Sequence, residues 1–589
     1  MAETTNKVKS GSFLLQAHRP ADVFIPEELT EEQRLIGETA RSFADKVREM
    51  LPEIEQDKPG KSRPLLREAG ELGLLALEIP EQYGGMGLDK ITATVATEEF
   101  SHAGPFSVTI GAQTGIGSLP IVYFGNQEQK AKYLPKLATG EWVAAYALTE
   151  PGSGSDALGA RTTARLSDCG KFWILNGTKQ WITNSGFADL FVVYAKVDGE
   201  KFSAFIVERN FPGVSVGPEE DKLGLRASST CSVILEDAKV PVENLLGEIG
   251  KGHLIAFNIL NIGRWKLGAG CTGSAKRSLQ VATEYAKTRE QFGRPIAEFR
   301  AIQQKLAEIN IRTYVNESIS YRVAGMIDAN LAGLDYTAED AGREAAKRIA
   351  EYAVECSISK VYGSEALFYA ADEALQIHGG YGFMNEYEVS AGYRDCRINR
   401  IFEGTNEINR LLIPGTLVRR ALKGELPLMA ALKGLQDDLM NLTPFEDSGQ
   451  PLAREQFLID RARKVFLLLA GLGVQKYGTA LEKEQELLMG VADIAIEIFA
   501  MESAVLRALK ARELGKAGIK LEMAQAYCQD AFERIGVIAR NLLAAIEEGD
   551  TLQTQLSILK RLTRYTPVNT VALKRQVASR VIEKGGYVS

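Results

Sequence analysis

Two short segments of this chain carry side chains whose types and spacing suit the binding of a flat, polar ring. The first is YALTEPGSGSD at 146–156, where an apolar run breaks at Thr149 into a loop rich in glycine and hydroxyl groups. Gly152 and Gly154 allow backbone conformations that a Cβ atom would penalise, and Pro151 fixes one dihedral angle. The free N–H groups of such a loop can bind a phosphate or the polar edge of a ring. Taken alone, the segment is more often a plain turn.

The second segment is WITNSG at 181–186. Trp181 and Thr183 are two positions apart, so on a strand both side chains lie on one face. An indole beside a hydroxyl can pack against an aromatic cofactor and hydrogen-bond one of its ring atoms. A tryptophan on a strand is, however, more often part of a hydrophobic core.

A third segment, RDCRINRIFEGTNEINRLL, places a carboxylate at a break in the chain. Glu403 follows two apolar residues and precedes Gly404, and Thr405 can cap a helix whose apolar positions follow at i, i+3 and i+4. A carboxylate beside apolar neighbours can have a raised pKa and act as a general base. The alternative is that Glu403 complements the helix N-terminus or pairs with Arg397 or Arg400.

Two further segments suit contact with a ligand, although packing is the default interpretation for both. QIHGGYGFMNE begins at Gln376, and its glycines, starting with Gly379 and Gly380, permit a close approach of the backbone to a flat or charged group. In YAKTREQFGRPI, Arg289 and Phe292 are three positions apart and can share one helical face.

Other patterns exclude whole classes of site. The GxGxxG match at 268–273 follows no buried strand and lies inside a long helical pattern, so it predicts close helix packing rather than a dinucleotide-binding loop. The four histidines form no ligand-like cluster, which predicts that there is no metal site. The six cysteines are scattered without a CxxC pair, as reduced thiols usually are.

Composition is that of a soluble globular protein. The net charge of −7 and the pI of 5.6 argue against nucleic acid as the main ligand. No apolar run approaches the ~20 residues that a membrane-spanning helix needs. The opening MAETTNKVKSGSF has no apolar signal core, which predicts a cytoplasmic protein.

Hydrophobic periodicity then indicates how the elements that position these segments are arranged. Helical spacing is expected over 27–141, short strands over 142–249, and long helices over 250–420. The prolines and polar residues of 421–451 are typical of a linker, which we place at 421–452. Helical spacing returns over 453–589. The fold class is therefore α+β, mostly α. Within the strand-rich part, Asn176-Gly177 between FWIL and KQWIT predicts a two-residue hairpin.

Together, the five segments stand in the order and spacing of the acyl-CoA dehydrogenase family, which this chain resembles over roughly residues 30–415. The helical region after 420 resembles the extension of the very-long-chain branch. The resemblance implies an N-terminal helical domain, a middle β domain, a C-terminal four-helix bundle and an additional helical domain. It also implies FAD as the cofactor.

The resemblance implies a role for each residue at the flavin end of FAD. Leu148 and Thr149 are expected to contact the flavin ring through backbone and hydroxyl. Trp181 is expected to flank the ring, and Thr183 to lie near its N5 atom.

The remaining FAD contacts are also implied by the resemblance. Arg289 and Phe292 are expected at the pyrophosphate and adenine portion. Gln376 to Gly380 are expected to reach the FAD of the neighbouring subunit, and Thr405 and Glu407 to make further contacts. Substrate contacts along the CoA arm are expected from Ser155, Asn261 and Arg264.

The reaction implied is the α,β-dehydrogenation of a fatty acyl-CoA to a trans-2-enoyl-CoA. Glu403 takes the α-proton, hydride leaves for flavin N5, and the electrons pass to an electron-transfer flavoprotein. Hydrogen bonds to the thioester carbonyl, one of them from the Glu403 N–H, stabilise the developing enolate. Some family members place the base near position 263, but Gly263 cannot act as one. Two alternatives stay open: an acyl-CoA oxidase that uses oxygen, and an assembly partner that keeps FAD as structure.

Three further expectations concern substrate size and partners. A helix containing 107–121, with Val108 and Ala112 small or apolar, is expected at the end of the acyl tail and favours long chains. The extension is expected to cover the bundle, so that the protein forms a homodimer. The basic segment 555–589 can lie on an anionic membrane surface, although a tail packed on its own domain is the favoured interpretation.

Overall fold

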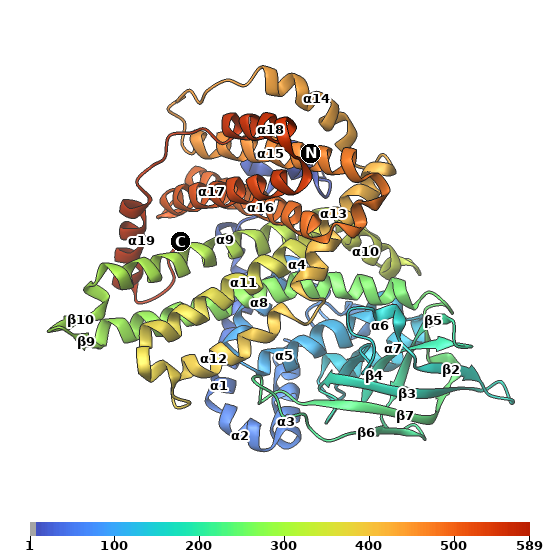
Figure 1. Cartoon of the computed structure of the whole chain (residues 1–589). Coiled ribbons are helices and arrows are strands. Elements are labelled where there is room, and N and C mark those ends of the chain that lie inside the picture. The colour runs from blue at the N-terminus through green and yellow to red at the C-terminus, as the bar shows by residue number, and fades with distance from the viewer. Residues whose placement is uncertain (1–6) are drawn as a thin grey trace.

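The computed structural model describes residues 7–589, in which helical layers surround a bundle and a β domain lies at one side (Figure 1). The prediction of a cytoplasmic protein rests on residues 1–13, and the first six of these lie outside the described residues. No helix of the described part is long and apolar enough to cross a membrane.

The N-terminal helices begin at caps that the sequence supplies. Helix α1 (Glu31–Glu49) follows Thr30, whose hydroxyl accepts the N–H of Gln33 at 3.2 Å while the Gln33 side chain accepts the N–H of Thr30 at 3.1 Å. Phe43 is buried as the helical spacing predicts, whereas Leu35 is 62% exposed. The domain continues with α2 (Leu51–Gln56), α3 (Lys58–Glu71), α4 (Lys90–Phe100), α5 (Phe106–Gly111), a π-helix (Ala112–Gly117), α6 (Leu119–Phe124) and α7 (Gln127–Ala138).

The middle domain is a mixed sheet whose inner strands are apolar and buried. Its strands run in the order β6-β7-β3-β2-β4-β5-β8, and β1 pairs in parallel with β4. The bounds are β1 (Ala144–Ala147), β2 (Thr163–Leu166), β3 (Phe172–Thr183), β4 (Leu190–Val197), β5 (Lys201–Glu208), β6 (Val214–Val216), β7 (Thr230–Pro241) and β8 (Leu245–Leu246).

The predicted hairpin at Asn176-Gly177 is wrong. Strand β3 runs straight through these residues and pairs with β7 and β2, with a register shift at Asn176. Asn176 Nδ2 donates to Asp237 Oδ1 at 3.0 Å across that bulge. A Cβ atom on Gly177 would lie 2.4 Å from Thr162 Oγ1, so the glycine is required by the close approach of a neighbouring strand and not by a turn.

Long helices form the bundle and the additional domain. The bundle comprises α8 (Gly252–Thr288), α9 (Arg300–Leu331), α10 (Ala341–Ala350), α11 (Ala353–His378), α12 (Glu388–Cys396) and α13 (Asn406–Leu422). The additional domain comprises α15 (Ala453–Tyr477), α16 (Gln485–Glu513), α17 (Lys520–Ile546), α18 (Gly549–Leu562) and α19 (Thr570–Lys584). These domains and their order confirm the predicted fold class. The GxGxxG match lies inside α8, where a Cβ atom on Gly268 would lie 2.1 Å from Ser359 Oγ, so close helix packing is confirmed.

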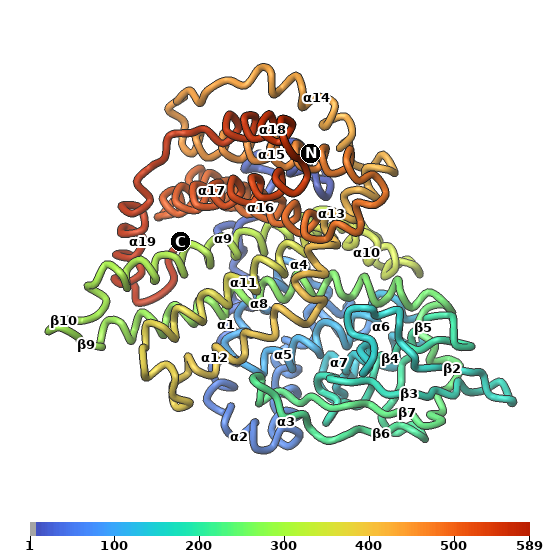
Figure 2. The backbone as a smooth tube through the Cα atoms, in the orientation of Figure 1, coloured from blue at the N-terminus to red at the C-terminus, as the bar shows by residue number. Residues whose placement is uncertain are grey.

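Two segments outside these helices were not predicted. Helix α14 (Leu428–Met440) lies within the stretch that the prolines mark as a linker. Residues 7–29 run beside the additional domain (Figure 2). There Phe13 packs edge-on against Phe499 at 4.9 Å, and the N–H of Gly11 donates to Glu355 of the bundle at 2.8 Å. The N-terminal segment therefore lies between the bundle and the additional domain.

The basic C-terminal segment is packed within the chain. Helix α19 buries Val577 and Val581 and contacts both α9 and α17. Beyond it, Tyr587 Oη donates to Glu317 at 2.5 Å and the N–H of Val588 donates to Asn310 Oδ1 at 2.9 Å. This arrangement supports the interpretation of a packed tail over that of a membrane-bound segment.

Candidate active site

A left-handed turn carries Glu403 between a 3-10 helix and α13. Glu403 has φ 58° and Gly404 has φ 79°, so both residues are in the left-handed region. This region is disfavoured for Glu403, because it has a Cβ atom. The turn ends at Thr405, whose Oγ1 accepts the N–H of Ile408 at 3.2 Å and caps α13, as predicted. A strained turn persists only where its surroundings hold it.

Buried donors hold every carbonyl of this turn. Arg264 Nε donates to the carbonyl of Glu403 at 3.1 Å. Lys360 Nζ donates to the carbonyl of Gly404 at 2.7 Å. Asn409 Nδ2 lies 3.3, 2.8 and 3.1 Å from the carbonyl oxygens of residues 403, 404 and 405. The backbone of the turn is therefore fixed from two neighbouring helices and from α13 itself.

The side chain of Glu403 is left free by these contacts. Its Oε2 atom is buried and makes no hydrogen bond within the described part of the chain. Burial raises the pKa of Glu403 to about 7, against the opposing effect of the Arg264 and Lys360 charges. Among the described residues Glu403 Oε2 has no hydrogen-bond partner, so neither Arg397 nor Arg400 pairs with that atom.

The Thr149 loop follows β1 and is fixed from β3. The carbonyl of Thr149 accepts the N–H of Gln180 at 2.9 Å. Glu150 and Ser153 exchange two backbone hydrogen bonds of 3.0 Å, which closes the Pro-Gly turn between them. Nothing lies within 4 Å of a Cβ atom placed on Gly152 or Gly154, so the outer side of the loop is open. Ser155 is exposed on that side.

A buried ion pair beneath this loop was missed in the sequence. Lys179 Nζ lies 2.7 Å from Glu150 Oε1 and 3.1 Å from the carbonyl of Leu148. Glu150 also accepts the N–H groups of Arg161 and Thr162 at 2.6 and 3.0 Å. The two charges stand in adjacent motifs, TEPGSGSD and KQWIT, but only the pairing of distant strands brings them together.

Trp181 and Thr183 lie at the end of β3, where the strand is irregular and the simple alternation behind the prediction is interrupted. Trp181 has φ 59° at a register shift between Lys179 and Ile182. Its indole is 60% exposed while Ile182 is buried. The tryptophan is therefore not a core residue in this chain, and its exposed ring is available to a ligand.

Asn261 and Arg264 are buried on α8 behind the Glu403 turn. Arg264 Nη1 donates to Asn261 Oδ1 at 3.1 Å, and its Nε is committed to the carbonyl of Glu403. Both residues thus lie beside the turn that carries Glu403. Ser155, Trp181 and the open glycines lie on the β domain.

Arg289 and Phe292 do not share a helical face. Helix α8 ends at Thr288, and Phe292 forms the turn between two short strands, β9 (Glu290–Gln291) and β10 (Arg294–Pro295), with φ 52°. Phe292 is 94% exposed. The prediction is wrong because a two-residue turn closed by Gly293 interrupts the helical spacing.

The glycine-rich segment lies beside that turn. The guanidinium of Arg289 lies over the ring of Tyr381 at 5.4 Å. Gln376 is exposed near the end of α11, and nothing lies within 4 Å of a Cβ atom on Gly379 or Gly380. At 1.5 Å per residue, the end of α8 lies about 36 Å along the helix from Arg264. These residues therefore form a second, separate group at the far end of the bundle (Figure 1).

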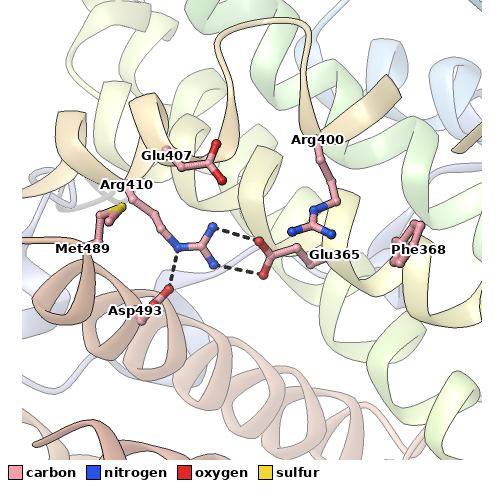
Figure 3. A pocket seen from close by; sticks show the side chains of 7 residues that line it. All are labelled: Glu365, Phe368, Arg400, Glu407, Arg410, Met489 and Asp493. Atoms are coloured by element: carbon pink, nitrogen blue, oxygen red, sulfur yellow. Dashed lines mark hydrogen bonds and ion pairs between the residues drawn. The ribbon is translucent and has the colours of Figure 1, made fainter. Parts of the chain in front are cut away.

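A cavity of about 510 Å³ opens beside the start of α13 (Figure 3). Its lining residues are Glu365, Phe368, Arg400, Glu407, Arg410, Met489 and Asp493. Arg410 lies between its two acidic partners, with Nη1 at 2.8 Å from Glu365 and Nε at 2.7 Å from Asp493. Figure 3 shows Glu407 in the cavity wall without a drawn partner. Helix α16 of the additional domain thus contributes to this wall.

The residues present fit FAD. An exposed indole, an open glycine loop and a buried carboxylate oxygen without a partner suit a flat ring with a reacting substrate beside it. The wall of the cavity beside α13 has both arginine and carboxylate side chains, and Arg410 is already paired with Glu365 and Asp493, so the wall has no net preference for an anion. In the described residues, no group of three or more metal-ligating side chains is found.

Comparison with known proteins identifies the family of this chain. Four family models match: the N-terminal domain of acyl-CoA dehydrogenase over 30–141, its middle domain over 145–238, and two C-terminal domains over 250–417 and 461–561. A probable acyl-CoA dehydrogenase from Bacillus subtilis is 54% identical over 98% of both chains.

Two further proteins are similar over most of the chain. The very long-chain specific acyl-CoA dehydrogenase of human mitochondria is 36% identical over 96% of this chain and 85% of its own. A crystal structure of acyl-CoA dehydrogenase complexed with FAD from Bacillus anthracis is 54% identical, has a TM-score of 0.97, and covers 99% of this chain and 100% of its own. The chain therefore belongs to the acyl-CoA dehydrogenase family and is an FAD-dependent oxidoreductase.

Proposed function

We propose that the protein dehydrogenates long-chain fatty acyl-CoA at the α,β position, with Glu403 as the general base. The observation that carries this proposal is the Glu403 carboxylate. Its Oε2 atom is buried without a partner among the described residues, and burial raises its pKa to about 7. A base whose pKa lies near the working pH is well matched to removing a weakly acidic proton.

The residues of this chain would act as follows. Glu403 Oε2 takes the α-proton of the thioester. The hydrogen bonds found within the described residues do not use the Glu403 N–H, which leaves it free to donate to the thioester carbonyl and stabilise the enolate. The acyl chain excludes water and strengthens the base further. FAD, when bound, supplies the acceptor for the hydride that leaves the β-carbon.

The flavin end of FAD is assigned to Leu148, Thr149, Trp181 and Thr183. Thr405 and Glu407 stand where the cavity beside α13 begins, and we assign them to the remainder of the cofactor. Substrate contacts are assigned to Ser155, Asn261 and Arg264.

A second copy of the chain is proposed to complete each FAD site. Phe292, Gln376, Gly379 and Gly380 are exposed and Arg289 is partly buried. This group lies near the end of α8, about 36 Å along that helix from Arg264. That distance is too great for these residues and those around Glu403 to contact the same flavin ring. We therefore assign the group at the end of α8 to the FAD of a partner subunit. The proposed assembly is a homodimer in the cytoplasm that passes electrons to an electron-transfer flavoprotein.

The long-chain preference rests on the segment before β1. The expected single helix over 107–121 is instead α5, a π-helix and α6, and π-helices are frequent at functional sites. Val108 lies in α5 and Ala112 begins the π-helix, and a Cβ atom on Gly111 would meet no atom within 4 Å. Each buried CH₂ group should add about 0.8 kcal/mol to binding until the tunnel ends.

Anaerobic mixing of the yellow holoenzyme with acyl-CoA tests this function. Bleaching of the flavin band that is fastest with palmitoyl-CoA is the expected result. Bleaching followed by rapid recolouring in air would identify an acyl-CoA oxidase instead. No bleaching at any chain length would favour an assembly role, and an optimum at butyryl-CoA would overturn the long-chain assignment.

A further inference from the structure

Lys360 is a buried lysine whose only two hydrogen bonds among the described residues go to the catalytic turn and the helix after it. It projects from the middle of α11 and is fully buried. Its Nζ atom lies 2.7 Å from the carbonyl of Gly404 and 2.7 Å from Oδ1 of Asn406. A buried ammonium without strong acceptors is costly, so its position is set by these two oxygens.

Asn406, which accepts a hydrogen bond from Lys360, also donates hydrogen bonds to two other residues of α11. Its Nδ2 atom donates to Ser364 Oγ at 3.1 Å and to Glu365 Oε1 at 2.9 Å. Lys360, Ser364 and Glu365 lie on one helix, so α11 holds the first residue of α13 and the carbonyl that precedes Thr405. Movement of the turn would break several buried hydrogen bonds at once.

The turn needs such support because its conformation is unfavourable. Glu403 has φ 58°, a left-handed conformation that is strained for a residue with a Cβ atom. Arg264 holds the carbonyl of Glu403 from α8, and Lys360 holds the next carbonyl from α11. The two cations therefore hold the consecutive carbonyl groups of Glu403 and Gly404, the two residues with left-handed φ values.

We propose that Lys360 is a positioning residue that holds Glu403 in the left-handed conformation required to aim its carboxylate at the substrate. This inference rests on the proposed role of Glu403 as the base. Lys360 does so through its hydrogen bonds to the turn, and its charge acts separately on the acidity of Glu403. Loss of that charge raises the pKa of Glu403, because a nearby cation favours the ionised carboxylate.

Three holoenzyme variants separate these effects in anaerobic single-turnover reduction with palmitoyl-CoA across pH. Lys360→Met is expected to reduce the plateau rate at least tenfold and to move the acid limb to higher pH. Lys360→Gln keeps a donor without the charge, so it should recover much of the plateau and keep the shifted limb. Lys276→Met removes a partly buried lysine, which bonds Glu98 and Glu317, and should leave the acid limb unchanged.

The crystal structure of the Lys360→Met holoenzyme gives a readout other than activity. Glu403 is expected to leave its left-handed φ value. A Lys360→Met enzyme with the wild-type plateau and acid limb, or with an unchanged Glu403 backbone, would overturn the proposal. If Lys360→Met does not fold with FAD, a Lys360→Gln enzyme in which Glu403 keeps its left-handed φ value but the plateau rate falls at least tenfold overturns it, because a kept donor and a kept turn should keep the rate. A Glu403→Gln enzyme that keeps the wild-type rate would instead overturn the proposed function.

Discussion

The carboxylate of Glu403 lies directly against the backbone of Gly263. A Cβ atom placed on Gly263 would be 2.6 Å from Glu403 Oε2 and 2.8 Å from its Cδ. The absence of a side chain on α8 thus makes the space that the Glu403 carboxylate occupies. Position 263 carries no carboxylate of its own and at the same time admits the proposed base from the turn.

Gly263→Ala is expected to slow flavin reduction at least tenfold while FAD stays bound. The new methyl group would have to displace the carboxylate, because contacts below 3.0 Å are not tolerated. Alanine has the higher helix propensity by about 1 kcal/mol, so the thermal midpoint should not fall for that reason. Gly270→Ala on the same helix is the control, since its Cβ atom would meet only Thr97 Cγ2 at 4.0 Å. Equal rates for the two variants would contradict the displacement.

Glu403→Gln is expected to lower the rate of flavin reduction by about 10²–10⁴-fold. The amide has nearly the same shape, so FAD content and acyl-CoA binding should remain. In the wild type, the base must be ionised, and its pKa is raised to about 7. The rate should therefore fall tenfold per pH unit well below pH 7. A near wild-type rate in stopped-flow reduction would show that another group removes the proton.

The same substitution should stabilise the holoenzyme at alkaline pH. Because folding raises the pKa of Glu403, the folded state favours the protonated form. Its stabilising effect is complete below the ordinary pKa of 4.5 and is lost as the pH rises through about 7. Glu403→Gln should thus have a higher thermal midpoint than the wild type at pH 8 and a similar one near pH 5. A difference that does not depend on pH would contradict the raised pKa.

Sequence patterns predicted the order of the helical and strand-rich regions and identified Glu403 and Trp181 as candidate site residues. They failed where contacts with distant segments determine the local structure. Asn176-Gly177 has the composition of a hairpin turn, yet β7 pairs across it. Phe292 fits a helical spacing, yet the Gly293 turn ends the helix. Lys179 and Lys360 carry no local signal at all, because a lysine is usually exposed and only tertiary packing buries these two.

The N-terminal segment adds a buried ionic cluster that no sequence pattern indicated. Glu502 on α16 accepts Arg322 Nη2 at 2.6 Å, His18 Nδ1 lies 3.0 Å from it, and Arg463 pairs with its other oxygen. The cluster joins residues 7–29, the bundle and the additional domain. It could not be foreseen because its members lie on separate segments, with His18 and Glu502 484 positions apart in the chain.

Glu502→Gln is expected to destabilise this junction by about 3–5 kcal/mol, because it leaves buried arginines without a compensating charge. The expected result is a lower thermal midpoint and faster proteolysis near residue 18. Glu482→Gln changes the same residue type at an exposed position of the additional domain and should have little effect. Equal midpoints for the two variants would show that the cluster does not hold the junction.

The additional domain is expected to make the full chain a dimer. Helix α16 packs on α9 and α13 of the bundle. The apolar residues expected to cover this face are Phe457, Val465, Leu468, Leu469, Ile494, Ile498 and Phe499, and all but the half-buried Phe457 are buried. Light scattering should therefore give twice 64.4 kDa for the full chain.

Truncation after Pro444 would expose that face and should produce tetramers or aggregates, since a large apolar surface invites association. It would also remove the contact of Phe13 with Phe499 and the ion pair of Arg322 with Glu502. Residues 7–29 should therefore become sensitive to protease. A double substitution, Phe13→Ala with Glu502→Gln in the full chain, separates these effects because it loosens the segment and leaves the bundle covered. A full-length tetramer, or a truncated chain that stays an active dimer, would show that the additional domain does not determine the assembly.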